Sequence, residues 1–413
     1  MRLERKLYPV NDVVFAGSSR YESGVVYLDV DELKAKTLLD ISGLTFDVKL
    51  TKPGESCRIV HVMDTLIPAC KHEGAVFSGW PEKNPSCGNG VTYMLDGVTV
   101  MQTGVFAGIQ EGIVDMSGAG SCYSEFSKTI NIVLSLDLLN KQMSKPDYER
   151  ASKTIILRAG EYLGSLCMNN EAHKTSVFEL NPVKDGLPRV GYACFIQAQG
   201  NLRNVFVHGQ EYTESRPILI HPNEMLDGGI VSSNFIIACQ KNPTWYYQKN
   251  PVVNELYRLH GQELDFCGVI ISNEANLLEE KTEYAASIAS IARELKLDGL
   301  IVSQEGGGHA DVDLMLTAEA CEPNIKTVLL ANEIAGPKGE LPPLVSFSSA
   351  ADAIVSAGNN DEIVTVGAVD TLIGGDSITG IKTSGKDCFE TSLGIFYTAT
   401  NQMGAHRMTT VEY

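Results

Sequence analysis

The chain has 413 residues, which is enough for two or more domains around a large hydrophobic core. Hydrophobic residues make up 44% of it and charged residues 20%, proportions that are typical of a soluble globular protein. The formal net charge of −18 disfavours a nucleic-acid partner, because proteins bind phosphate backbones through clusters of Lys and Arg. We therefore expect a globular protein that binds no nucleic acid.

The negative charge is concentrated in the second part of the chain. Residues 239–413 hold 11 Lys and Arg against 24 Asp and Glu, a net charge of −13, whereas residues 1–238 hold 22 against 27, a net charge of −5. Such asymmetry indicates either a solvated acidic surface or a docking face for another protein.

Ten cysteines are spread along the chain without a CxxC pair. A zinc site or a disulfide framework would show closer, patterned spacing. The polar sequence after Met1 lacks the apolar core of a signal peptide, and no segment approaches 18 uninterrupted apolar residues. We expect a cytoplasmic protein with reduced thiols and no membrane segment.

Residues 1–140 are predicted to be mainly β, because short β-branched runs alternate with turn residues. One helix is predicted at residues 30–39. The run at residues 129–136 is rich in Ile, Val and Leu and alternates weakly, which indicates a deeply buried strand. The loop at residues 78–90 has the length of either a functional loop or a plain connector. The other strands are predicted at residues 13–15, 25–28, 44–50, 58–62 and 98–101.

A long helix is predicted at residues 145–168, where Pro146 suits the first turn. His208 and His221 lie at the ends of two of the strands expected after it. Each is either a catalytic base or a structural histidine. These strands are predicted at residues 189–197, 205–208 and 217–220.

After residue 239 the sequence alternates between strands and helices, which indicates a parallel sheet covered by helices. The predicted fold class is α/β: residues 1–238 form a β-rich N-terminal unit, and residues 239–413 form an alternating strand-helix C-terminal unit with a parallel sheet. Ligands of such sheets bind outside the carboxyl ends of the strands. Helices are predicted at residues 252–260, 277–296 and 312–320, and strands at residues 266–272, 299–303 and 327–331.

A glycine-rich loop at residues 304–313 lies at one of these strand ends. Its glycines let the backbone approach a ligand closely, and the following helix N-terminus favours an anion. It lacks the glycine patterns of dinucleotide-binding and P-loop proteins, so a nucleotide is poorly supported. A metal site that includes Asp311 and Asp313, and a tight turn with an Asp cap, remain alternatives. The candidate substrate-binding residues are Gly307, Gly308 and His309.

The stretch at residues 234–247 separates the two predicted units, yet it carries an apolar run, a cysteine and three consecutive aromatic residues. Linkers are normally flexible and polar. Cys239 could attack the preceding Ala238 carbonyl in an N-to-S acyl shift, because cysteine is intrinsically very nucleophilic. Elimination and hydrolysis would then convert residue 239 to a pyruvoyl group. The alternative is an inert buried cysteine, and Ser232 and Ser233 are rival nucleophiles.

The sequence around Cys239 resembles the proprotein of component B of the glycine/sarcosine/betaine reductase family. The resemblance covers nearly the whole chain, and its specificity comes from the order of the matching stretches. These are KPGE at residues 52–55, FSKTIN at 126–131, MLDGG at 225–229, NPVV at 250–253 and ELY at 255–257.

The resemblance implies cleavage after Ala238 into two subunits, with a pyruvoyl group derived from Cys239 at the start of the second. It implies that this group captures the amine of a small amino acid as a Schiff base for reductive C–N cleavage. The implied partners are a selenocysteine-containing component B subunit, a small selenoprotein A and an acetyl-phosphate-forming component C. Whether the substrate is glycine, sarcosine or betaine stays open. The alternative function is an unprocessed scaffold or small-ligand-binding subunit of a multiprotein complex.

Overall fold

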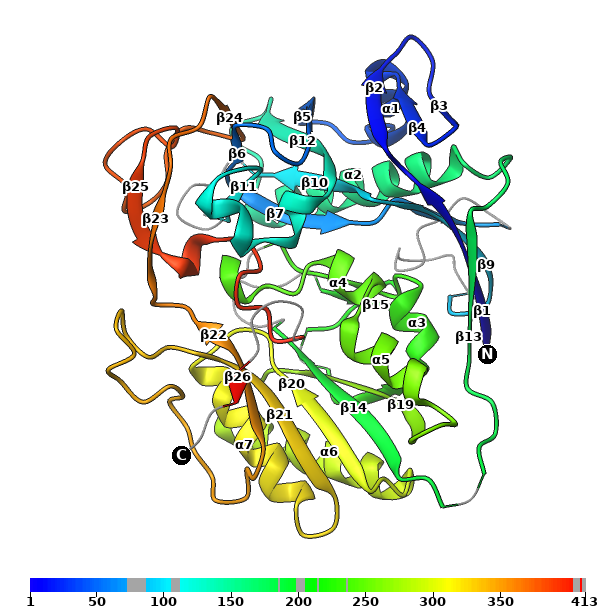
Figure 1. Ribbon diagram of the computed structural model, residues 1–413, viewed down its shortest axis with the longest axis vertical. Helices are drawn as coiled ribbons and strands as arrows, with labels where there is room; N and C mark the ends of the chain where they lie inside the picture. The colour runs from blue at the N-terminus through cyan, green and yellow to red at the C-terminus, as the bar shows by residue number, and fades with distance from the viewer. Residues whose placement is uncertain are drawn as a thin grey trace.

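The computed structural model describes residues 1–72, 87–104, 112–184, 186–197, 205–213, 215–234, 237–403 and 409–410. Most of the loop predicted at residues 78–90 lies outside these ranges. The fold is α/β, as predicted, with a β-rich part above a larger sheet in Figure 1 and the helices α3, α4 and α5 between them.

The β-rich part contains two four-stranded sheets, with strand orders β13-β1-β9-β8 and β5-β12-β10-β7. The predicted buried strand is β12, which pairs with β10 in parallel and with β5 in antiparallel fashion. The bounds are β1 Arg2–Pro9, β5 Leu44–Thr51, β7 Val62–Leu66, β8 Ala69–Lys71, β9 Gly90–Asp96, β10 Val98–Thr103, β12 Ile130–Leu138 and β13 Lys174–Glu179.

Helix α2, Lys145–Ser165, covers these sheets and confirms the long helix predicted from the sequence. Ser144 caps its first turn, where Pro146 needs no hydrogen-bond acceptor. Gly164 lets the helix touch β8 directly, because a Cβ atom there would lie 2.5 Å from the Ala69 backbone. A small sheet, β2 Asp12–Phe15, β3 Arg20–Glu22 and β4 Val25–Leu28, stands beside α1 Val30–Thr37.

The larger sheet has seven strands in the order β17-β19-β14-β20-β21-β22-β26. Its five central strands are parallel, and only the edge strands β17 and β26 are antiparallel. Helices α6 and α7 cover one face with an apolar core. The bounds are β14 Arg189–Ile196, β17 Ile218–Ile220, β19 Asp265–Asn273, α6 Leu278–Glu294, β20 Gly299–Ser303, α7 His309–Cys321, β21 Lys326–Glu333, β22 Ile354–Asn359 and β26 Thr409–Thr410.

This sheet takes strands from both sides of residue 239. The central strand β14 and the edge strand β17 precede that residue, whereas β19 to β22 follow it. In the other direction, β24 Thr371–Ile373 pairs in parallel with β6 Cys57–Ile59 of the β-rich part. A division of the chain at residue 239 therefore does not separate the β-rich part from the seven-stranded sheet, because each contains strands from both sides of that residue.

The remaining elements connect the two parts. The run predicted as one strand at residues 58–62 is split into β6 and β7, because His61 has a positive φ of 59° that interrupts the extended backbone.

No described helix combines the length and apolarity needed to span a membrane. The connecting elements are β11 Val114–Asp115, α3 Pro222–Leu226, β18 Ile230–Val231, the 3-10 helix η3 Ala238–Gln240, α4 Thr244–Gln248, α5 Pro251–Leu259, β23 Ile363–Val366, β25 Phe389–Ser392 and η4 Leu393–Ile395.

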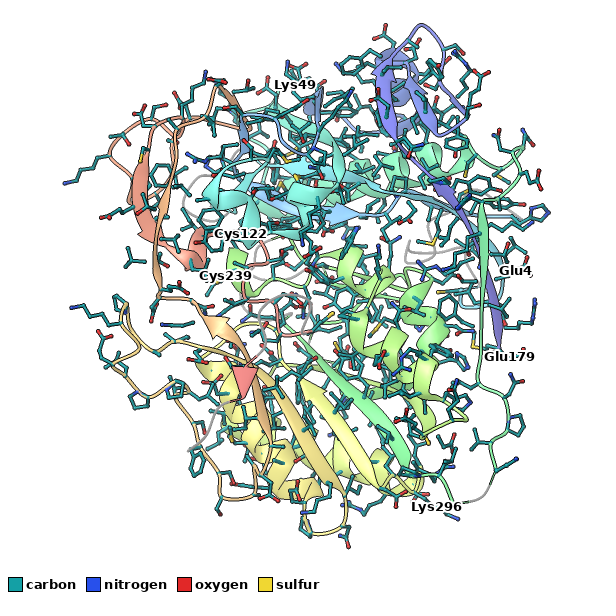
Figure 2. All side chains as sticks on the ribbon, viewed as in Figure 1. Glu4, Lys49, Cys122, Glu179, Cys239 and Lys296 are labelled. Atoms are coloured by element: carbon teal, nitrogen blue, oxygen red, sulfur yellow. The ribbon has the colours of Figure 1, made fainter. Side chains whose placement is uncertain are left out.

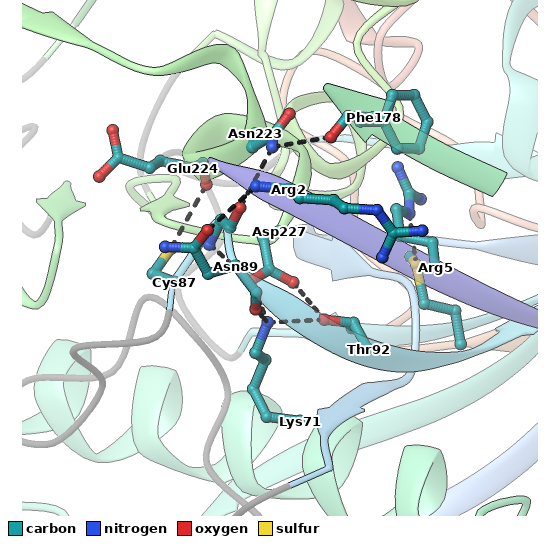
Figure 3. A network of polar contacts seen from close by, with 12 residues as sticks. Arg2, Arg5, Lys71, Cys87, Asn89, Thr92, Phe178, Asn223, Glu224 and Asp227 are labelled. Carbon is teal, nitrogen blue, oxygen red and sulfur yellow. Dashed lines mark hydrogen bonds and ion pairs between the residues drawn. The ribbon is translucent and has the colours of Figure 1, made fainter. Parts of the chain in front are cut away.

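A buried ion pair fastens α3 to the β-rich part (Figure 3). Lys71 Nζ lies 2.7 Å from Asp227 Oδ2 and also donates to the Asn89 carbonyl and to Thr92 Oγ1. Thr92 Oγ1 donates in turn to Asp227 Oδ1 at 2.6 Å. The charged groups are therefore hydrogen-bonded on both sides, which offsets part of the cost of their burial.

Candidate functional site

Cys239 lies in η3, between the β-rich part and the larger sheet (Figure 2), and is fully buried. It packs in an apolar cluster with Leu393, Phe396 and Ala399 of the C-terminal segment. Burial raises the pKa of the thiol to about 12, and a contact with the Thr400 hydroxyl opposes part of that rise. The thiol is thus neutral at physiological pH, and it becomes a nucleophile only when a base removes its proton.

The backbone on both sides of Cys239 is held by the C-terminal segment. The Thr398 N–H donates to the Ala238 carbonyl at 2.9 Å, and the Lys241 N–H reaches the same oxygen at 3.4 Å. One residue further, the Thr400 N–H donates to the Cys239 carbonyl at 3.0 Å. Two N–H groups therefore point at the carbonyl that a Cys239 thiolate would attack, where an oxyanion would need stabilisation.

Thr398 adopts a backbone conformation that is rare for its residue type. Its φ is +68°, in the left-handed region that a β-branched side chain disfavours. Such a conformation costs about 1–3 kcal/mol and is concentrated at functional sites. Here it directs the Thr398 N–H toward Ala238.

A group of buried charges lies beside this segment. The Lys241 ammonium donates to the Ser233 carbonyl. Burial lowers the pKa of Lys241 to about 8, against the attraction of Asp64. Burial likewise raises the pKa of Glu305 to about 7, against the attraction of Lys241. Burial thus moves the pKa values of both groups toward neutral pH.

The rival nucleophiles Ser232 and Ser233 are both fully buried. The Ser232 hydroxyl donates to the Ser233 carbonyl at 3.3 Å, and the Ser232 N–H donates to Thr244 Oγ1 at 3.0 Å. The two-donor arrangement described above lies at the Ala238 carbonyl, which is the carbonyl that Cys239 and neither serine would attack.

The glycine-rich loop lies against the residue that follows Cys239. A Cβ atom on Gly307 would lie 2.8 Å from Gln240 Nε2 and 2.9 Å from Asn332 Oδ1, so any larger residue would displace these two side chains. Gly308 has a positive φ of 71° and ends the loop at the start of α7. The structure thus brings the predicted residue Gly307 next to the segment that holds Cys239.

The predicted residue His309 is exposed, and its Nε2 atom lies 3.2 Å from the Asn276 carbonyl. Burial of its ring and the nearby Lys281 lower its pKa. The His309 ring therefore contacts Asn276, whereas Gly307 lies against Gln240 and Asn332.

The carboxylates considered for a metal site have other partners. Asp311 accepts hydrogen bonds from Gln304 Nε2 and the Val345 N–H, both at 2.9 Å, and Asp313 forms a buried ion pair with Lys281. Within the described ranges, no group of three or more His, Cys, Asp or Glu residues is placed to hold a metal ion.

The two histidines proposed as bases have structural contacts. His221 caps α3 through its Nδ1 atom, and burial lowers its pKa to about 4. His208 Nε2 lies 3.6 Å from the Glu224 carboxylate. Both histidines therefore contact residues of the helix α3.

Sequence reasoning missed the residues that complete the site. Thr398, Gln402, Asn332 and Glu305 come from three segments, and only Glu305 lies within a stretch that the sequence singled out. A polar run at residues 398–402, with two threonines, an asparagine and a glutamine, was the available signal. It is buried because the chain returns between the two sheets.

Comparison with known proteins agrees with the predicted resemblance. The family model for glycine/sarcosine/betaine reductase component B subunits matches residues 1–410. The chain is 36% identical over 431 aligned positions to the glycine reductase complex component B subunits alpha and beta of Acetoanaerobium sticklandii, and the match covers all of both chains. It is 33% identical over 383 positions to the sarcosine reductase complex component B subunit alpha of Peptoclostridium acidaminophilum, covering 91% of this chain and 89% of the relative.

A more distant relative is the D-proline reductase proprotein PrdA of Acetoanaerobium sticklandii, which is 21% identical over 339 positions. That match covers 75% of this chain and 51% of the relative. No solved structure matches the chain. The family model and the similar relatives agree over almost the full length, and the chain therefore belongs to the glycine/sarcosine/betaine reductase component B family.

Proposed function

We propose that this chain is the self-cleaving precursor of the pyruvoyl-bearing subunit pair of an amino-acid reductase. The observation that carries the proposal is the Ala238 carbonyl, which accepts the Thr398 N–H at 2.9 Å directly before the buried Cys239. This arrangement would stabilise an oxyanion on the carbonyl during attack. The D-proline reductase relative, which is named as a proprotein, supports a processed precursor.

In the proposed cleavage, the Cys239 thiolate adds to the Ala238 carbonyl carbon and expels the peptide nitrogen, which takes up a proton. A thioester then joins Ala238 to the Cys239 sulfur. Loss of the Cys239 α-proton breaks the Cβ–S bond, leaving a thiocarboxylate on Ala238 and dehydroalanine at residue 239. Tautomerisation to an imine and addition of water release ammonia and leave the pyruvoyl group.

The surroundings of residue 239 fit a small ketone-bearing group. Gln240 directly follows it and lies against Gly307, and the Thr400 N–H donates to the residue 239 carbonyl at 3.0 Å. The group would supply an electrophile that captures the substrate amine as a Schiff base. The protein residues would orient the substrate and exclude water, because this region is buried.

We propose glycine or an N-methylated glycine as the substrate, since the relatives are named for glycine, sarcosine and betaine reductase complexes. A quaternary amine such as betaine cannot form a Schiff base, so glycine and sarcosine agree best with the mechanism. The selenium chemistry is assigned to partners: a selenocysteine-containing component B subunit and a small selenoprotein A. An acetyl-phosphate-forming component C completes the proposed complex, which we place in the cytoplasm.

The intact mass of protein purified from its native host tests the processing. We expect fragments of about 26 and 19 kDa, in proportion to residues 1–238 and 239–413. Cys239→Ala should remain a single chain and bind no substrate covalently, whereas Cys239→Ser should cleave slowly, because a hydroxyl is a weaker nucleophile than a thiol. Borohydride should fix labelled glycine or sarcosine onto the smaller wild-type fragment.

The serine alternative needs a matched control. A Ser232→Ala, Ser233→Ala double variant should cleave like the wild type, because neither serine is the proposed nucleophile. Normal cleavage in Cys239→Ala would instead move the nucleophile elsewhere. A single full-length chain in the native host would favour the unprocessed scaffold.

A further inference from the structure

Five side-chain amides converge on the glycine-rich loop. Gln304 Nε2 and Gln402 Nε2 both donate to the Gly306 carbonyl. The side chains of the other three lie close to the two glycines. Gln197 Nε2 lies 3.0 Å from the point where a Cβ atom on Gly306 would be. Gln240 Nε2 and Asn332 Oδ1 lie 2.8 and 2.9 Å from the point where a Cβ atom on Gly307 would be. The five amides come from five separate segments, so only the tertiary structure assembles them.

These amides have buried atoms without a hydrogen-bond partner among the described residues. The side-chain oxygens of all five are unpartnered, as is Nδ2 of Asn332. Gln240, Gln304, Asn332 and Gln402 are each at most 1% exposed. A buried polar atom left unpaired costs about 1–3 kcal/mol, so a concentration of such atoms indicates a group that pairs with them when bound.

The chemistry of the cluster indicates a small zwitterion. Amide oxygens accept hydrogen bonds from an ammonium group, and amide nitrogens donate to a carboxylate. Among the described residues, five amide oxygens of the cluster are unpartnered against one amide nitrogen, Nδ2 of Asn332. Acceptors therefore outnumber donors, which favours a ligand whose nitrogen carries hydrogen atoms.

We propose that the amide cluster formed by Gln197, Gln240, Gln304, Asn332 and Gln402 is the binding site for the free amino acid. This inference rests on the proposed function, since Gln240 directly follows the residue that would carry the ketone. The cluster holds the carboxylate and the N–H groups of the amino acid before it reacts. It selects glycine or sarcosine over betaine, whose nitrogen has no hydrogen to donate.

Asn332 offers the sharpest test, because neither of its side-chain polar atoms has a hydrogen-bond partner in the part of the chain that the structure describes. Asn332→Leu replaces these atoms with methyl groups of similar volume and breaks no described hydrogen bond. We expect the Tm to stay the same or rise, because the buried unpaired groups are removed. We expect the Kd for glycine to increase about tenfold or more, measured by calorimetric titration and by the glycine-dependent shift in Tm.

Asn131 on β12 is the matched control. It is also fully buried, but it accepts from Thr99 Oγ1 at 2.7 Å and donates to the Phe126 carbonyl at 2.9 Å. Asn131→Leu should therefore lower the Tm and leave the Kd for glycine unchanged in the folded protein. The opposite responses of the two variants separate a binding role from a structural one.

The titrations are made in the Cys239→Ala background, where no ketone forms, so binding is measured even if the processing proposal fails. Sarcosine should stabilise this protein as glycine does, and betaine should not. Two results would overturn the inference: unchanged glycine binding in Asn332→Leu, or equal stabilisation by betaine. Failure of the wild type to cleave would overturn the proposed function alone.

Discussion

At the scale of single residues, the unusual backbone conformation of Thr398 determines where its N–H group points. Its φ of +68° is unfavourable for a threonine, yet it places the N–H 2.9 Å from the Ala238 carbonyl. Burial raises the pKa of the Cys239 thiol to about 12, so the proposed attack on this carbonyl starts from a neutral thiol. Stabilisation of the developing oxyanion is therefore the contribution that we assign to Thr398.

An amide-to-ester replacement at residue 398 removes this N–H and keeps the side chain. It can be made by ligating a synthetic peptide of residues 388–413 at the native, exposed Cys388. Loss of one oxyanion donor should slow cleavage about 10²–10³-fold, measured by mass spectrometry during refolding.

The matched control is the same replacement at Ala399, whose N–H donates to the Phe396 carbonyl at 3.2 Å. Each ester deletes one backbone hydrogen bond, so the two proteins should have similar stability. If they also cleave at the same rate, the Thr398 N–H has no part in processing.

At the scale of elements, the Lys71–Asp227 pair joins β8 to the end of α3. Both side chains are buried, with exposures of 5% and 0%. Asp227 also accepts hydrogen bonds from Thr92 Oγ1 and the Gly88 N–H, which hold the carboxylate in place. The ion pair thus links the β-rich part to the helix α3.

Lys71→Met should lower the free energy of unfolding by about 3–5 kcal/mol, because it leaves the Asp227 carboxylate buried without its counter-charge. Chemical denaturation of the Cys239→Ala protein measures this without interference from cleavage. The control is Lys326→Met: Lys326 is 75% exposed and pairs with Glu322 and Asp352 at the surface. That change should stay within about 0.5 kcal/mol. A similarly small effect of Lys71→Met would mean that the buried pair does not stabilise the fold.

At the scale of the whole molecule, the proposed cleavage point lies inside an interwoven fold. Strand β14 precedes residue 239 and forms parallel ladders with β19 and β20, which both follow it. Strand β24 returns to pair with β6. Separation of the fragments would remove a central strand and leave unpaired backbone groups on both neighbours.

We therefore expect the two fragments to co-elute on gel filtration after cleavage and to separate only in denaturant. The processed protein should also unfold in a single thermal transition, because each fragment completes the core of the other. Separate elution without denaturant would contradict the pairing of β14 with β19 and β20.

The sequence by itself determined the local structure and the family. The helix α2 and the alternating elements from β19 to β21 were predicted closely, because periodicity and capping act over neighbouring residues. The resemblance also pointed to Cys239, and the glycine-rich loop at a strand end pointed to Gly307, since both lie in continuous stretches of distinctive sequence.

Only the tertiary structure decided how these stretches meet. It places β14 in the centre of a sheet whose other parallel strands follow residue 239, aims the Thr398 N–H at Ala238, and gathers five amides around Gly306 and Gly307. The physical reason is that long-range pairings depend on which buried faces and backbone groups find partners across the whole fold. The His309 side chain, for example, lies in the same continuous stretch of sequence as Gly307, but its contact with Asn276 depends on how the helix α7 packs.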